Sequence, residues 1–227
     1  MKGIRIPGSE ARGFTLVELL VGLALALLVI AGGGALLTSQ IREHRALVLE
    51  ARLMQDLRTA ADLVARDLRR AGYWGDAGAG VWSAAVPARA NPYAALAPDD
   101  AASDAASLRY SRDAIENHVV DGNEQFGFRL RNRAIEIQLG SGNWQALTDA
   151  TLLAVTGFVI TPQTATIALG AGCRAPCPTE DESCPRQQLT SFALEISAHA
   201  LADAAVTRTV HARVRVRNDA SSGACPA

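Results

Sequence analysis

A glutamate at the start of an apolar stretch constrains this chain more than any other feature. Glu18 precedes an apolar run from Leu19 to Leu37, which is long enough to cross a bilayer. An ionised carboxylate in a membrane segment is costly and usually marks a function. Residues 1–13 carry more basic than acidic side chains. The positive-inside rule therefore predicts that they stay in the cytoplasm while the rest of the chain is exported.

Three simpler explanations exist for this segment. Thr15 and Glu18 have the spacing of a capping box, in which hydroxyl and carboxylate bond free amides of the first helical turn. A cleaved secretory signal has a shorter apolar core of about 7–15 residues and a small-x-small site beyond it, which residues 38–42 do not supply. An ordinary membrane anchor fits the length, but it does not require a glutamate at position 18.

The string GFTLVELL, from Gly13 to Leu20, resembles the class III signal of type IV pilins and of type II secretion pseudopilins. The resemblance implies that a prepilin peptidase cuts after Gly13, which makes Phe14 the N-methylated first mature residue. It also implies that Glu18 guides subunits into a growing filament. The physics agrees, because a new amine at Phe14 in a bundle of apolar helices would pair with Glu18 of a neighbouring subunit, offsetting the burial cost of both charges.

Beyond the apolar run, the sequence has the period of an amphipathic helix that buries one stripe. The apolar residues at intervals of three or four are Leu53, Leu57, Ala60, Ala61, Val64, Leu68 and Ala71. Arginines fill the last two turns, where positive charge complements the helix dipole, and Gly72 can adopt the left-handed C-cap conformation. We therefore expect a transmembrane or filament-core helix over 14–38 and its amphipathic continuation over 39–72.

Residues 73–227 are expected to form one periplasmic head domain that is rich in β-strand. Alternating apolar and polar residues predict strands over 125–130, 134–139, 144–148, 152–161, 189–200 and 206–217. The first three should form a meander, whereas residues 81–106 have no clear period and are expected to be an irregular connection. The predicted fold class is α+β and pilin-like. A long N-terminal hydrophobic helix packs on an antiparallel β-sheet domain, and the C-terminal region contains disulfides.

Two short motifs resemble the PilW family of minor pilins, whose close relatives are the GspJ-type pseudopilins. They are DLRRAGY at 67–73, where the helix ends, and VRVRN at 214–218. The resemblance implies a minor pilin that helps to prime and assemble a type IV pilus, with a secondary expectation that it lies at the tip. Implied partners are the prepilin peptidase, the major pilin, other minor pilins and the assembly platform of the inner membrane. The alternatives are a minor pseudopilin of a type II secretion system and a membrane-anchored periplasmic binding or adhesion module.

All four cysteines follow the apolar segment, which fits an oxidising periplasm and two disulfides. They are Cys173, Cys177, Cys184 and Cys225. Spacing leaves three connectivities open, and one bond is expected to tie Cys225 to the 173–184 loop. A four-cysteine zinc site is the alternative, but Cys184 and Cys225 lack the short ligand spacing of zinc sites. Calcium at residues 180–182, Glu-Asp-Glu, is a second alternative, although these residues lack the spaced ligands of a calcium loop.

Nucleic-acid binding and catalysis have little support in the sequence. Arg213, Arg215 and Arg217 share a strand face, but no aromatic residue alternates with them to stack bases. The net charge of −1 gives no general attraction to a polyanion. The histidines, His44, His118, His199 and His211, belong to no metal or nucleophile motif. We therefore expect no cofactor, no metal, no nucleic-acid partner and no enzymatic activity.

Overall fold

The computed structural model describes residues 13, 15–81, 88–177 and 183–226. The chain divides into two compact units, Met1–Val48 and Leu49–Ala227, and each is described by itself. Helix α1 (Leu16–Arg70) supplies nearly all of the described part of the first unit and the first element of the second. The second unit is called the head below.

In the first unit, α1 is apolar on every side. The large apolar side chains from Leu16 to Leu37 are all more than half exposed. The helix runs without a break through Gly32, Gly33 and Gly34, and a Cβ built at any of these glycines would meet open space. A helix that is hydrophobic all round belongs in a membrane or in a bundle of similar helices.

In the head, α1 buries one stripe against the rest of the unit. All seven apolar residues of the predicted stripe, from Leu53 to Ala71, are buried, which confirms the periodicity. The helix ends at Arg70, and Gly72 follows with φ of +72°, the left-handed conformation expected for a C-cap. The side chain of Asn218 completes the cap, because its Nδ2 donates to the carbonyl oxygens of Arg70 and Ala71.

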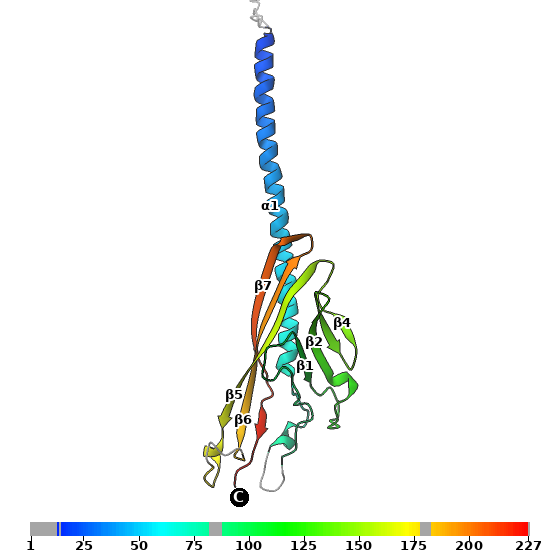
Figure 1. Cartoon of the computed structure of the whole chain (residues 1–227), viewed down its shortest axis with the longest axis vertical. Helices are drawn as coiled ribbons and strands as arrows, with labels where there is room; N and C mark the ends of the chain where they lie inside the picture. Colours follow the sequence, from blue (N-terminus) through cyan, green and yellow to red (C-terminus); the bar gives the residue numbers. More distant parts are fainter. Residues whose placement is uncertain (1–12, 14, 82–87, 178–182, 227) are drawn as a thin grey trace, which may run out of the picture. The chain divides into compact units, whose positions relative to one another are not determined.

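The β-strands of the head form two antiparallel sheets, which are labelled in part in Figure 1. The first sheet has the order β1 (Ala105–Arg109), β2 (Gln125–Arg131), β3 (Ala134–Leu139) and β4 (Trp144–Ala146). The second has the order β5 (Leu153–Ala168), β6 (Arg186–Ala200) and β7 (Asp203–Arg215), and β8 (Ala220–Ser222) also pairs with β6. Three short 3₁₀ helices are η1 (Ala77–Gly80), η2 (Gly122–Glu124) and η3 (Gly170–Gly172).

This architecture confirms the predicted fold class and adds detail that the sequence did not predict. The β2–β3–β4 meander is present, but β1 joins its edge and begins inside the segment expected to be irregular. The strands divide into two sheets, which Ser103 links through a bridge to Ile160, with hydrogen bonds of 3.0 and 2.8 Å between their backbones. Strand β5 continues to Ala168, and the short β8 was not predicted. β1 and β8 escaped notice because three to five residues are too few to show a period.

The core of the head combines side chains from α1 and from both sheets. Its largest fully buried members include Leu57 of α1, Phe128 of β2, Phe158 of β5 and Phe192 of β6. In Figure 1 the sheet containing β5, β6 and β7 and the sheet containing β1, β2 and β4 flank the cyan part of α1. Burial of these apolar surfaces is the main force that holds the head together.

Candidate processing and assembly sites

The N-terminal site is a helix start with one exposed carboxylate. Thr15 precedes α1, and its Oγ1 accepts a hydrogen bond of 3.2 Å from the backbone N–H of Glu18. This is the hydroxyl half of a capping box. The carboxylate of Glu18 has no hydrogen-bond or ion-pair partner among residues 13, 15–81, 88–177 and 183–226. Half of the box therefore forms, and the carboxylate remains available to another molecule.

The processing site itself is described only in part. Gly13 is exposed, whereas Phe14 and residues 1–12 lie outside the described residues. Helix α1 is long and apolar enough to cross a membrane, by length and composition. The first unit thus presents Gly13, an exposed acid and an exposed apolar helix along one continuous stretch of chain.

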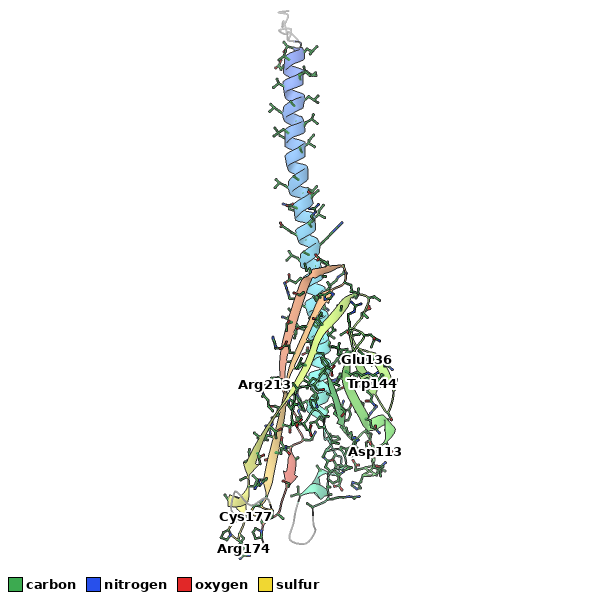
Figure 2. The ribbon with its side chains drawn as sticks, in the orientation of Figure 1. Asp113, Glu136, Trp144, Arg174, Cys177 and Arg213 are labelled. Carbon is green, nitrogen blue, oxygen red and sulfur yellow. A yellow bond between two sulfur atoms is a disulfide. The ribbon has the colours of Figure 1, made fainter. Side chains whose placement is uncertain are left out.

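Two disulfides close the far end of the second sheet, where Figure 2 labels Cys177 and Arg174. Cys173 bonds Cys225, with 5.3 Å between their Cα atoms, and Cys177 bonds Cys184, with 5.8 Å. The first bond links Cys225 to the 173–184 loop, in agreement with the expectation from sequence. All four sulfur atoms are used in these bonds, so they are not available for the zinc alternative. The acidic residues 180–182, considered for calcium, lie outside the described residues.

Glycine permits the backbone to approach closely at these bonds. A Cβ on Gly223 would lie 2.2 Å from the carbonyl oxygen of Cys184, and Gly223 also has a φ of +73°. A Cβ on Gly170 would lie 2.5 Å from the carbonyl oxygen of Cys177. Both contacts are too short for any side chain. The tail is held further by the N–H of Ala224, which donates to the carbonyl of Ser183 at 2.9 Å.

The two motifs that resemble PilW-type proteins meet in space. The backbone N–H of Arg217 donates to the carbonyl of Arg69 at 3.0 Å, and Asn218 caps the same helix end as described above. Residues 67–73 and 214–218 therefore form one joint, in which the end of the last long strand satisfies carbonyls that the helix leaves open. Helix exit and closing strand thus depend on each other, although they lie almost 150 residues apart.

Comparison with protein families identifies two matches along the chain. Residues 46–216 match the family model described as prepilin peptidase-dependent protein B, PpdB, and residues 9–34 match the prokaryotic N-terminal methylation motif. The chain belongs to the PpdB family. No curated protein and no solved structure matches it. The chain is accordingly a type IV pilin-like, prepilin peptidase-dependent protein, with a class III signal and an apolar helix that fit membrane anchoring. Pilin-like families are structural rather than enzymatic.

The head of this PpdB-family protein also contains a half-buried carboxylate, Glu116, whose hydrogen bonds the sequence analysis missed. Glu116 accepts hydrogen bonds from the backbones of Gly75 and His118, at 3.0 and 2.9 Å, and from the hydroxyl of Tyr93 at 3.0 Å. Burial by itself would raise the pKa of Glu116, but these bonds and one from Ser111 outweigh it and lower that pKa. Glu116 thus ties the helix exit to two loops. The available signal was an aromatic residue, Tyr93, in a segment that is otherwise rich in alanine and proline.

Glu124 also accepts hydrogen bonds from backbone N–H groups, in the neighbouring loop. Its carboxylate is fully buried, and it accepts from the backbone N–H groups of Arg112, at 2.7 Å, and Asp121, at 2.9 Å. Its oxygens, with those of Asp113 and Asp121, lie within 4.8 Å of one another, and Figure 2 labels Asp113 there. The backbone donors explain the burial of Glu124 without a bound ion. This acidic cluster is therefore part of the loop's structure.

The histidines form no shared site. His118 accepts a hydrogen bond from Trp74 at 3.2 Å, and His211 lies 3.6 Å from Glu195. Within the described ranges, no group of three potential metal ligands includes a histidine.

Proposed function

We propose that this protein is a minor pilin of a type IV pilus that takes part in priming and assembly of the filament. In this proposal residues 1–13 are a cytoplasmic leader, 14–38 the transmembrane and filament-core helix, 39–72 its amphipathic continuation and 73–227 the periplasmic head. The protein starts in the bacterial inner membrane with its N-terminus in the cytoplasm, and later joins the filament at the cell surface. Its partners are prepilin peptidase, the major and minor pilins and the assembly platform.

One observation carries the proposal. Glu18 is an exposed carboxylate without a partner in the described chain, at the start of a helix whose apolar surface is also uncovered. For a solitary chain, the carboxylate is costly inside a membrane, and the apolar surface is costly in water. Both are satisfied when similar helices pack together, because the apolar surfaces cover one another and Glu18 pairs with the N-methylated amine of a neighbour's Phe14.

The joint between residues 67–73 and 214–218 supports the PilW-like subfamily. Both motifs that resemble PilW contribute to one contact, so they form a single structural feature. A minor pseudopilin of a type II secretion system, of the GspJ type, remains the alternative function because it shares the signal. Deletion of the gene in the native host separates the two. Loss of surface pili and twitching motility with intact protein secretion supports the pilus, whereas the converse supports the secretion system.

The first experiment measures the mature N-terminus. The protein is recovered from native membranes, with and without the prepilin peptidase, and its intact mass and N-terminal peptide are determined. A peptidase-dependent start at N-methylated Phe14 is expected. A start at Met1, or cleavage beyond Leu37, would overturn the pilin proposal.

The second experiment tests the role of Glu18. Glu18→Ala should leave cleavage intact but lower the amount of protein recovered in sheared filaments by about tenfold or more, because a buried charge loses its partner at a cost of about 3–5 kcal/mol. Glu43→Ala, on the same helix but outside the apolar run, is the matched control and should assemble normally. Normal assembly of the Glu18→Ala protein would remove the role proposed for Glu18, whereas absence of the parent chain from sheared filaments would favour a membrane-anchored binding or adhesion module.

A further inference from the structure

Three exposed arginines without ion-pair partners gather where β7 meets the end of α1. The basic patch consists of Arg69, Arg213, Arg215 and Arg217, and these residues with Val214 and Val216 line a shallow depression of about 380 Å³. Arg215 pairs with Asp219 at 2.8 Å. Arg69, Arg213 and Arg217 have no ion pair within residues 13, 15–81, 88–177 and 183–226.

The core fixes the direction of these side chains. Val214 and Val216 are buried, at 2% and 3% exposure. Since successive side chains of a strand point to opposite faces, Arg213 and Arg215 of β7 point outward. Arg217 lies two residues beyond the end of β7, and its side chain is also exposed. Arg69 is held beside them because the N–H of Arg217 bonds its carbonyl oxygen. Figure 2 labels Arg213 on β7, an outer strand of the second sheet. The patch is therefore preorganised by the backbone.

The concentration of one charge sign at this place is unusual for the chain as a whole. Lysine and arginine number 22 against 23 acidic residues, so the average surface is balanced. The negative end of the helix dipole helps to explain the position of Arg69 in the last turn of α1. It does not explain the arginines of β7. Clustered cations repel one another, and a partner's carboxylates would relieve this repulsion.

We infer that the basic patch docks an acidic segment of a neighbouring pilin-like subunit. The spacing of Arg213 and Arg215 fits such a segment, because alternate residues of a strand lie about 6.6 Å apart, as do alternate carboxylates of an extended acidic stretch. Arginine binds carboxylates in a bidentate manner and is enriched at protein interfaces. No aromatic side chain is among the lining residues, so the patch lacks the stacking platform of a single-strand nucleic-acid site. The inference rests on the proposed function, which supplies the neighbouring subunits.

The test places a photoreactive amino acid at Ala193 in the full-length chain, in the native host. Ala193 is the cross-strand partner of Arg213 in the β6–β7 register, so it lies within reach of whatever docks on the patch. The expected adduct joins this chain to another protein that the prepilin peptidase has processed, through a peptide with at least two acidic residues. A crosslink to lipid, to nucleic acid or to a second copy of this chain would overturn the inference, as would no crosslink.

Charge variants complete the test. Arg213→Glu with Arg217→Glu should reduce the adduct by about tenfold or more, and reversal of the partner's acids should restore it. Arg109→Glu with Arg131→Glu, two exposed arginines of the first sheet, changes the net charge equally and should leave the adduct unchanged. Arg213→Lys with Arg217→Lys keeps the charge and should retain most of the adduct, which separates charge loss from misfolding. Equal crosslinking of the Glu variant and the parent chain would overturn the inference.

Cleavage is measured on the same samples, so the two proposals fail in different ways. A chain that starts at N-methylated Phe14 but forms no patch adduct leaves the pilin proposal standing and removes only the docking partner. If the prepilin peptidase never cleaves the chain, both the pilin proposal and the docking inference are overturned.

Discussion

The two units of the chain use the same helix in opposite ways. From Leu16 to Leu37, α1 is apolar on all sides and its large side chains are exposed, whereas from Leu53 onward it buries one stripe and leaves polar residues outside. The head therefore satisfies its own apolar surface. The N-terminal unit does not, and the surface that covers it has to come from a membrane or from other helices. Hydrophobicity alone does not distinguish these roles, but its periodicity does.

A pair of equivalent leucine truncations is expected to separate the units most strongly. Leu57 is fully buried and Leu25 is 60% exposed. Leu57→Ala should lower the free energy of unfolding of the head by about 2–5 kcal/mol, because it leaves a cavity in the core. Leu25→Ala should change it by less than about 0.5 kcal/mol. Urea unfolding of the full chain in detergent, followed by tryptophan fluorescence, measures both. Similar losses for the two variants would contradict the division.

The disulfides also distinguish the two units, because both of them lie in the head. Cys173→Ser with Cys225→Ser should destabilise the head by about 2–4 kcal/mol, since this bond closes a loop of 52 residues. The Cys177–Cys184 bond spans only 7 residues, so its removal should cost about 2 kcal/mol less. The same urea experiment compares the two double variants. The helical circular dichroism of α1 in detergent should be unchanged in both, and a larger cost for the shorter loop would be the contrary result.

The features that could be predicted from the sequence are those set by residues close together in the chain. The stripe from Leu53 to Ala71, the left-handed Gly72 and the β2–β3–β4 meander depend on neighbouring residues, and all were predictable. The link of Cys225 to the 173–184 loop was expected from composition and compartment, but the two pairings needed coordinates. The division into two sheets and the Ser103–Ile160 bridge that links them involve residues far apart in the sequence, and no local pattern encodes them.

The candidate sites show the same limit. Gly13, Phe14 and Glu18 could be proposed from the sequence because the class III signal is a short contiguous string. Glu116, by contrast, draws its donors from Gly75, Tyr93 and His118, and no spacing rule joins them. The basic patch could be predicted only in part. Its strand arginines were visible as an alternation, but Arg69 joins them only through the fold.

The carboxylates Glu116 and Glu18 differ between the two units in the same way. Their substitution is expected to have the smallest effect, on the pH dependence of the head's stability. Glu116 is satisfied within the head, and the hydrogen bonds that overcome its burial lower its pKa from the ordinary value of 4.5. A group whose folded pKa is lowered contributes stability above its unfolded pKa, and this contribution is lost as pH falls through the folded pKa. The head should therefore lose stability between neutral pH and pH values below 4.5, and Glu116→Gln should flatten this loss. Tyr93→Phe removes one donor and should flatten it less. Glu18→Gln should leave this pH profile unchanged, because the carboxylate of Glu18 has no partner in the described part of the chain; a matching change would place Glu18 inside the same folding unit as Glu116.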